Sequence, residues 1–233
     1  MKFYSSNPRA VILVTAPFVA CRCLSIHKNI SCCCKRICYG CDHANKNRED
    51  ERRLQQKCAF CRTAFPETKE ENIEQLMKRI EANDPVALCQ RGAEKHKEGD
   101  YKSAFEYSAR AAAMGDSEAH YQLSILYHIG QGIEKDEKKE LYHSKEAAIA
   151  GHHMARFNLG FMEAENGRFE RAAKHWIIAA KLGDQRSLDG VKALYKNGDL
   201  SKEDFTAALR GHKAAIDAMK SPQREEAEKI RGA

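Results

Sequence analysis

Between residues 84 and 219, apolar residues recur every three or four positions, as they do along one face of an amphipathic helix. In the stretch 119–127, for example, Ala119, Leu123 and Leu126 fall on one such face. The pattern Ala-Ala-x-x-Gly begins at residues 111, 147 and 179, at spacings of 36 and 32 residues, and a weaker copy without the glycine begins at residue 214. Self-similarity at this period predicts stacked units of two helices each.

The ends of these units carry residues typical of helix boundaries. The glycines of the three full copies stand where a helix ends in a left-handed residue, which favours glycine: Gly115, Gly151 and Gly183. Asp116 and Asp184 follow directly and are predicted to cap the next helices. The aromatic residues of the repeats are expected in the core: Tyr121, Tyr127, Phe157, Phe161 and Trp176.

The second unit has the fullest pattern: Ala119, Leu123, Tyr127, Gly130-Gln131-Gly132-Ile133, Asp136, and Ala147-Ala148 before Gly151. This array resembles the Sel-one-like repeats, which are relatives of the tetratricopeptide repeats. The resemblance implies a mainly α protein whose residues 84–220 form a right-handed α-α superhelix, or solenoid, of about four two-helix repeats. It also implies that the concave face of the solenoid binds other proteins.

The segments that flank the array are predicted to be helical. Apolar residues spaced along 70–82 predict a helix that caps the first repeat, within a linker and capping segment at 66–83. Asp84 and Pro85 mark the start of the first repeat helix. The last repeat ends near residue 220, and the C-terminal tail, 221–233, contains a further short helix at 223–230.

Nine of the ten cysteines lie between Cys21 and Cys61. They include two C-x2-C pairs sixteen residues apart, in the order Cys38, Cys41, Cys58 and Cys61, and a triplet just before them, Cys32, Cys33 and Cys34. Thiolates spaced in this way can reach a single tetrahedral Zn²⁺ from a tight turn, and Gly40 is expected to shape the first of these turns. Residues 31–65 are therefore predicted to form a small, irregular, zinc-bound module.

The module resembles the last part of a RING finger. Cys33 lies five residues before Cys38, and the final pair reads Cys58-Ala59-Phe60-Cys61-Arg62. The resemblance implies two cross-braced zinc sites. In one, Cys58 and Cys61 would be joined by Cys33 and by Cys32 or Cys34; in the other, Cys38 and Cys41 would join a leading pair.

Several positions depart from the RING pattern. The candidates for the leading pair are Cys21 and Cys23, which are one residue too close together, and the middle histidine is missing. Ala59 replaces the proline that helps to bind a ubiquitin-conjugating enzyme. Arg62, however, matches the arginine that contacts ubiquitin in active ligases. His43 is expected on the surface, although ligation stays open, and a short helix with a solvated charged face is expected at 44–57.

Two functions follow from these features. The first is a protein-interaction role in which the RING-like module recruits a ubiquitin-conjugating enzyme and the repeats select the substrate. A RING supplies no nucleophile and acts by orientation, so no catalytic residue is expected. The alternative is a non-enzymatic scaffold with one structural Zn²⁺ bound by Cys58, Cys61 and the triplet. One or two zinc ions are therefore expected per chain.

Charge is distributed unevenly along the chain. Of its 233 residues 42% are hydrophobic and 31% charged, which is typical of a folded protein. Residues 1–65 carry a net charge of +8 and residues 66–233 a net charge of −2. A basic segment can bind nucleic acid, but it also offsets metal-bound thiolates. Because no nucleic-acid motif accompanies the charge, a nucleic-acid partner is not expected.

Residues 1–30 form an apolar N-terminal segment without a clear assignment. The run 10–20 is too short to span a bilayer, so no membrane span is expected. It resembles the core of a signal peptide, but Pro17 interrupts it and Phe18 would occupy a cleavage position that prefers a small residue. A cytoplasmic location is expected, and a signal peptide at residues 1–20 stays open.

Overall fold

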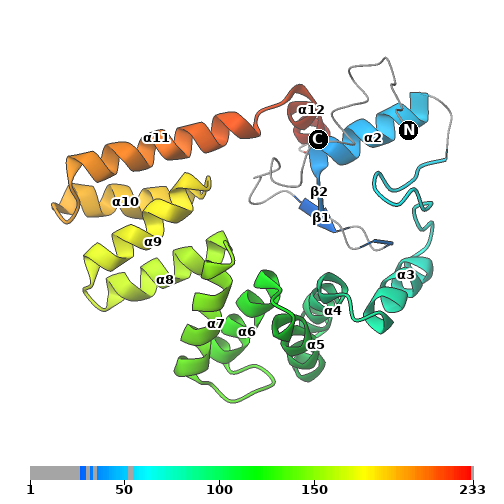
Figure 1. Ribbon diagram of the computed structural model, residues 1–233, viewed down its shortest axis with the longest axis horizontal. Helices are drawn as coiled ribbons and strands as arrows, with labels where there is room; N and C mark the ends of the chain where they lie inside the picture. Colours follow the sequence, from blue (N-terminus) through cyan, green and yellow to red (C-terminus); the bar gives the residue numbers. More distant parts are fainter. Residues whose placement is uncertain (1–26, 30–31, 34–35, 52–54, 232–233) are drawn as a thin grey trace, which may run out of the picture.

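The computed structural model describes residues 27–29, 32–33, 36–51 and 55–231 (Figure 1). At the N-terminal end, strands β1 (His27–Asn29) and β2 (Arg36–Cys38) pair in antiparallel register, with Lys28 opposite Ile37. Helix α2 (Tyr39–Glu51) follows directly. The apolar run at 10–20 lies outside the described residues.

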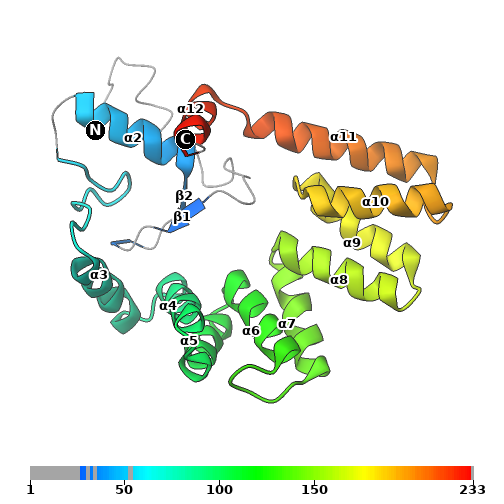
Figure 2. The same ribbon diagram turned by 180° about the vertical axis from the view of Figure 1, so that it is seen from behind.

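The rest of the chain is helical and forms an array of paired helices. Helix α3 is followed by four pairs, α4–α5, α6–α7, α8–α9 and α10–α11, in which each helix packs against the next. The bounds are α3 (Lys69–Glu81), α4 (Pro85–Lys97), α5 (Tyr101–Ala113), α6 (Ser117–Ile129), α7 (Glu137–Ile149), α8 (His153–Glu165), α9 (Phe169–Lys181), α10 (Gln185–Asn197), α11 (Lys202–Met219) and α12 (Pro222–Arg231). The pairs follow one another along an arc (Figures 1 and 2). The predicted helical solenoid is confirmed.

The predicted boundary residues explain where the repeat helices begin and end. Gly115, Gly151 and Gly183 have φ angles of 81°, 89° and 98°, in the left-handed region that a side chain would make costly. Asp116 accepts a hydrogen bond from the backbone N–H of Ala119 and so caps α6. The array is therefore divided into units by local chemistry that recurs along the sequence.

Small side chains form the contacts between neighbouring helices. Alanines at equivalent positions of successive helices are almost fully buried, which lets the backbones approach closely: Ala104, Ala111, Ala119, Ala147, Ala155, Ala172, Ala179 and Ala208. Larger apolar residues fill the space between these contacts, with Leu88, Leu123 and Leu126 at the centre of the first two units. The core of the array therefore consists of three buried clusters that follow one another along the helices.

One prediction about the core is wrong. Phe161 is 50% exposed, because its neighbour Gly160 faces the Trp176 ring and the next residue on a helix points about 100° away. Tyr127 and Trp176 are buried as predicted. The weak fourth alanine pair, at 214–215, lies inside α11 and packs less closely than the others, since no further repeat helix follows it there.

Among the described residues, no helix is both long enough and apolar enough to cross a bilayer.

The contact between α6 and α7 contains a histidine pair. His120 Nδ1 lies 2.9 Å from His143 Nδ1, and the His143 ring stacks on Tyr127. Burial lowers the pKa of His143 to about 4, and the nearby charges of His120 and Lys139 act in the same direction. The folded chain therefore resists protonation at this position.

We expect the thermal stability of the array to fall as the pH drops from about 6.5 towards 4. Across this range an unfolded chain protonates His143 while the folded chain does not, so protons favour unfolding. Melting temperatures measured between pH 4 and 7.5 check this. His143→Gln should flatten the slope, and an unchanged slope in this variant would contradict the assignment.

Candidate metal centre

Four cysteine side chains converge on one point in the N-terminal module. Cys32 Sγ lies 3.3 Å from Cys61 Sγ, and Cys33 Sγ lies 3.7 Å from Cys58 Sγ. All four sulfur atoms lie within 4.8 Å of one another. Cys58 is fully buried, whereas Cys61 is exposed at the edge of the cluster. The structure thus joins two residues of the triplet to the last C-x2-C pair.

A tight turn presents Cys58 and Cys61. The backbone N–H of Cys58 donates to the carbonyl of Thr63 at 2.8 Å, and that of Arg62 donates to the carbonyl of Cys58 at 3.1 Å. The N–H of Phe60 also points at Cys58 Sγ, at 3.4 Å. These hydrogen bonds hold the turn that carries the two sulfur atoms.

The spacing of the sulfur atoms suits a tetrahedral metal ion. Zinc–sulfur bonds of about 2.3 Å place the ligands of a tetrahedron roughly 3.8 Å apart. The separations of 3.3 Å and 3.7 Å are close to this value. No disulfide joins the four residues. These four thiols could therefore bind one metal ion, with no ligand position left open for a substrate.

The surroundings of Cys61 and Cys32 shift the pKa values of these two thiols in opposite directions. Burial opposes ionisation of the Cys61 thiol, but hydrogen bonds with Thr63, Cys32 and Cys58 outweigh it and lower the pKa of Cys61 to about 6. Burial raises the pKa of Cys32, and its contacts with Cys61 and Cys58 raise it further. Without a metal, Cys61 is thus the thiolate of this pair and Cys32 the thiol.

In metal-free protein we expect Cys61 to be alkylated much faster than Cys32, with a rate that rises through about pH 6. Labelling with iodoacetamide between pH 4.5 and 9, followed by peptide mass spectrometry, measures this. Thr63→Val should move the midpoint for Cys61 to higher pH because a stabilising hydroxyl is lost, while Thr63→Ser should retain it. Equal rates for Cys61 and Cys32 throughout would contradict the assignment.

The other candidate ligands have different positions. Cys41 is half-buried in the first turn of α2 and packs against Ile37 and Cys58, outside the four-sulfur cluster. Cys38 ends β2, and its side chain lies outside the described part of the chain. Cys21, Cys23 and Cys34 also lie outside the described residues. The second predicted zinc site stays a prediction.

Two local predictions for this region are wrong. Gly40 was expected in a tight turn between Cys38 and Cys41, but it is a buried residue of α2, which begins at Tyr39. A strand that leads directly into a helix replaces the turn. His43 was expected on the surface, but its side chain is only 17% exposed, because α12 packs over this part of α2.

Polar residues of α2 tie the helix to the cysteine turn. Asn45 Nδ2 donates to the carbonyl of Lys57 at 3.0 Å, and the Lys57 N–H donates to Glu49 Oε2 at 2.8 Å. Arg62 Nη1 lies 3.3 Å from Glu49 Oε1, with Glu49 almost fully buried. The sequence predicted a solvated face here, which is wrong for Asn45 and Glu49. Their spacing of four residues on one helix face was the available signal.

Comparison with known proteins supports the fold of the array. No family model matches the chain. A curated relative, chitin synthase regulatory factor 4 from Schizosaccharomyces pombe, is 33% identical over 93 residues, which is 40% of this chain and 14% of the relative. A Sel1 repeat protein from Oxalobacter formigenes matches with a TM-score of 0.56 at 19% identity, over 71% of this chain and 50% of that one.

A second structure, of a protective antigen of uropathogenic Escherichia coli strains that displays an SLR fold, aligns over 71% of this chain and 37% of its own, at 22% identity and a TM-score of 0.46. This chain spans a small part of the curated relative and half of the Oxalobacter protein. The array has the Sel1 repeat fold, as the sequence resemblance implied. The RING resemblance has no counterpart in these comparisons.

Proposed function

We propose that this protein is a non-enzymatic interaction scaffold, in which a Sel1-type helical array binds a partner protein and one structural Zn²⁺ holds the N-terminal module. The closed set of four thiols supports the structural role, since catalytic zinc sites keep a position open for water or substrate. Cys32, Cys33, Cys58 and Cys61 would be the ligands. The ion would replace the large apolar core that so small a module lacks.

The amount of zinc per chain tests the metal part of this proposal. We expect one Zn²⁺ per chain in protein purified without chelator, and none in Cys58→Ser. Cys41→Ser should keep the ion, because Cys41 lies outside the four-sulfur cluster. Two ions per chain, one of which is lost in Cys41→Ser, would instead support the complete cross-brace of a RING. Absence of zinc from the wild-type protein would contradict both arrangements.

The interaction role rests on the repeat array. Stacked two-helix repeats form extended curved surfaces that bind partners in many proteins, and the units here follow such an arc (Figure 1). We propose that the concave face binds another protein. The curated relative bears the name of a regulatory factor, which agrees with a binding role.

Cross-linking locates the partner on the array. The first helices of the pairs are taken as one layer and the second helices as the other. Lys95 and Lys192 lie in the first layer, and Lys145 and Lys174 lie in the second. Binding to the concave face should confine cross-links to the lysines of one layer. Cross-links spread evenly over both layers, or absent from the array, would contradict this proposal.

A ubiquitin ligase is the second candidate function. It is favoured by α2, which leads from Cys41 towards Cys58, and by Arg62 directly after the last ligand, where the RING resemblance places a ubiquitin contact. Arg62 is half-exposed but already paired with Glu49, so ubiquitin would compete with that ion pair. Self-ubiquitination across a panel of conjugating enzymes tests this candidate. Activity that is lost in Arg62→Ala would support it, and inactivity with every enzyme would rule it out.

A further inference from the structure

The last helix of the chain lies on the first module. Helix α12 packs against α2, although about 180 residues separate them in the sequence. Figures 1 and 2 both show α12 beside α2, opposite the central units of the array. The C-terminal segment therefore closes the arc of repeats onto the N-terminal module, a contact that the repeat pattern does not require.

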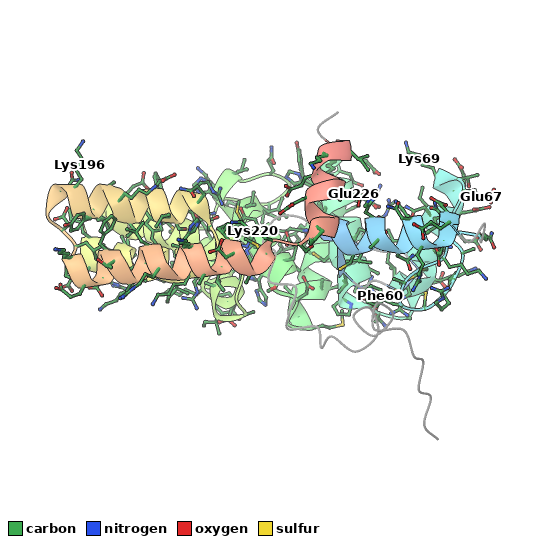
Figure 3. The ribbon with its side chains drawn as sticks, turned by 90° about the horizontal axis from the view of Figure 1, so that it is seen from above. Phe60, Glu67, Lys69, Lys196, Lys220 and Glu226 are labelled. Carbon is green, nitrogen blue, oxygen red and sulfur yellow. The ribbon has the colours of Figure 1, made fainter. Side chains whose placement is uncertain are left out.

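The length of α11 brings α12 to this position. The other helices of the array have 13 residues each, whereas α11 has 18. At about 1.5 Å per residue, the five additional residues extend α11 by roughly 7 Å towards the N-terminal module. Lys220 and Ser221 then form a short link, and Pro222 begins α12 at a position where proline suits a helix. Figure 3 shows Lys220 between the array and α12.

Few of the described side chains hold α12 in place. Glu226, which Figure 3 labels on α12, places its Oε2 3.7 Å from His43 Nε2, and Asn47 Nδ2 lies 3.0 Å from the same ring nitrogen. Ala227 is half-buried, while Ile230 is 62% exposed and the other described side chains of α12 are exposed too. A surface contact of this kind contributes little, so the described side chains of α12 hold it on α2 only weakly.

A helix of this size depends on the surface that it covers. Isolated helices shorter than about 12–15 residues are marginal in water, and α12 has ten residues. Helix formation and docking on α2 should therefore occur together. The segment then has two states, one helical and bound to α2, the other released and unfolded, at a lower cost than opening the array.

We propose that α12 is an intrachain ligand of α2, which must be released before a helix of a partner protein can bind the same surface. The competing helix would present a small residue and a neighbouring carboxylate, as α12 does with Ala227 and Glu226. Tethering favours α12, because a short link gives an effective concentration of the order of 1 mM. A partner must therefore bind α2 more tightly than α12 does alone.

The surface of α2 that α12 covers also depends on the cysteine cluster. Asn45 and Glu49 attach α2 to Lys57, which directly precedes Cys58. This step rests on the proposed zinc centre: removal of the ion should loosen α2 and release α12. The docking itself needs only the contact between the two helices, so the two ideas can fail separately.

Hydrogen exchange in the full-length, zinc-loaded protein tests the docking. We expect the amides of α12 to exchange at least tenfold more slowly than those of an unfolded chain. Ala227→Arg, which places a long side chain at the half-buried position, and Glu226→Pro, which breaks the helix, should remove this protection. Glu228→Arg is the matched control because that residue is exposed. Unprotected α12 amides in the wild-type protein would overturn the proposal.

Competition tests the ligand role. A synthetic peptide with the sequence of residues 220–231, added at up to about 5 mM to exceed the effective concentration of the tethered helix, should protect α2 in Glu226→Pro but not in the wild-type protein. Failure to bind the opened variant would overturn the proposal. A dimer in size-exclusion chromatography that Ala227→Arg dissociates would place α12 on a second copy and would also overturn it.

Removal of zinc by a chelator tests the docking of α12 separately from the proposed zinc centre. Chelation should expose both α2 and α12 to exchange, while the docking variants keep their full zinc content. If α12 stays protected after zinc is removed, the coupling is wrong although the docking stands. If no zinc is present at the start and α12 is protected, the zinc centre is wrong and the intrachain ligand stands.

Discussion

Replacing Trp176 by alanine is expected to lower the free energy of unfolding by about 3–5 kcal/mol, the usual cost of removing a large buried aromatic side chain. Trp176 is 7% exposed and packs at the centre of the core shared by α9, α10 and α11. Its indole N–H donates to the carbonyl of Phe157 at 3.1 Å. The ring thus joins the third repeat to the fourth, and its removal leaves a cavity at their boundary.

Phe161→Ala provides the matched control. It removes a smaller aromatic ring from the neighbouring helix, and because Phe161 is 50% exposed the expected cost is below about 1 kcal/mol. Chemical denaturation followed by circular dichroism gives both values. Equal losses in the two variants would contradict the burial assigned to Trp176.

Two glycines make room for the same ring. A β-carbon at Gly160 would lie 2.4 Å from Trp176 Nε1, and one at Gly190 would lie 2.7 Å from its Cε3. Neither glycine has the left-handed backbone that glycine favours, so space is the reason for both. Gly160→Ala should therefore destabilise the protein by about 1–3 kcal/mol. In the double variant with Trp176→Ala, the loss in the free energy of unfolding should be smaller than the sum of the two single losses. A loss equal to that sum would contradict a clash between the added methyl group and the ring.

The repeat array could be predicted from the sequence because its determinants are local. Gly151 sets a left-handed helix end and Asp116 caps the next helix through contacts within a few residues, and the alanine pattern repeats these signals. Phe161 shows the limit of this reasoning. Its apolar character suggested the core, but which residue faces the neighbouring helix depends on the position of Trp176, fifteen residues further along the chain.

The cysteine cluster was only partly predictable. A C-x2-C pair indicates ligands, but spacing alone does not say which distant cysteines share one ion. The RING resemblance paired Cys33, together with Cys32 or Cys34, with the last pair, and the structure places Cys32 and Cys33 beside Cys58 and Cys61. The contact between α2 and α12 joins segments that no periodic pattern relates, so the sequence offered no signal for it.

Removal of the proposed zinc ion is expected to unfold the N-terminal module and leave the repeat array folded. Structural zinc in small domains contributes an apparent binding free energy of about 10–16 kcal/mol, far more than the few buried side chains around Ile37 and Cys58 can supply. The array has its own core along α4–α11 and should not need the ion. Cys58→Ser, or a strong chelator, should therefore abolish protection from hydrogen exchange in β2 and α2 while the melting temperature of the array changes little.

Cys89→Ser is the reciprocal control for this prediction. Cys89 is buried in α4 and accepts a hydrogen bond from Gln122 Nε2, so its replacement acts on the first two repeats and not on the metal centre. This variant should lower the melting temperature of the array and keep one zinc ion per chain, the reverse of Cys58→Ser. If Cys58→Ser instead lowered the melting temperature of the array as well as unfolding the module, the array and the module would form one cooperative unit. The zinc ion would then stabilise the whole chain, because loss of the ion would weaken the contact between α2 and α12 and so destabilise the last repeat.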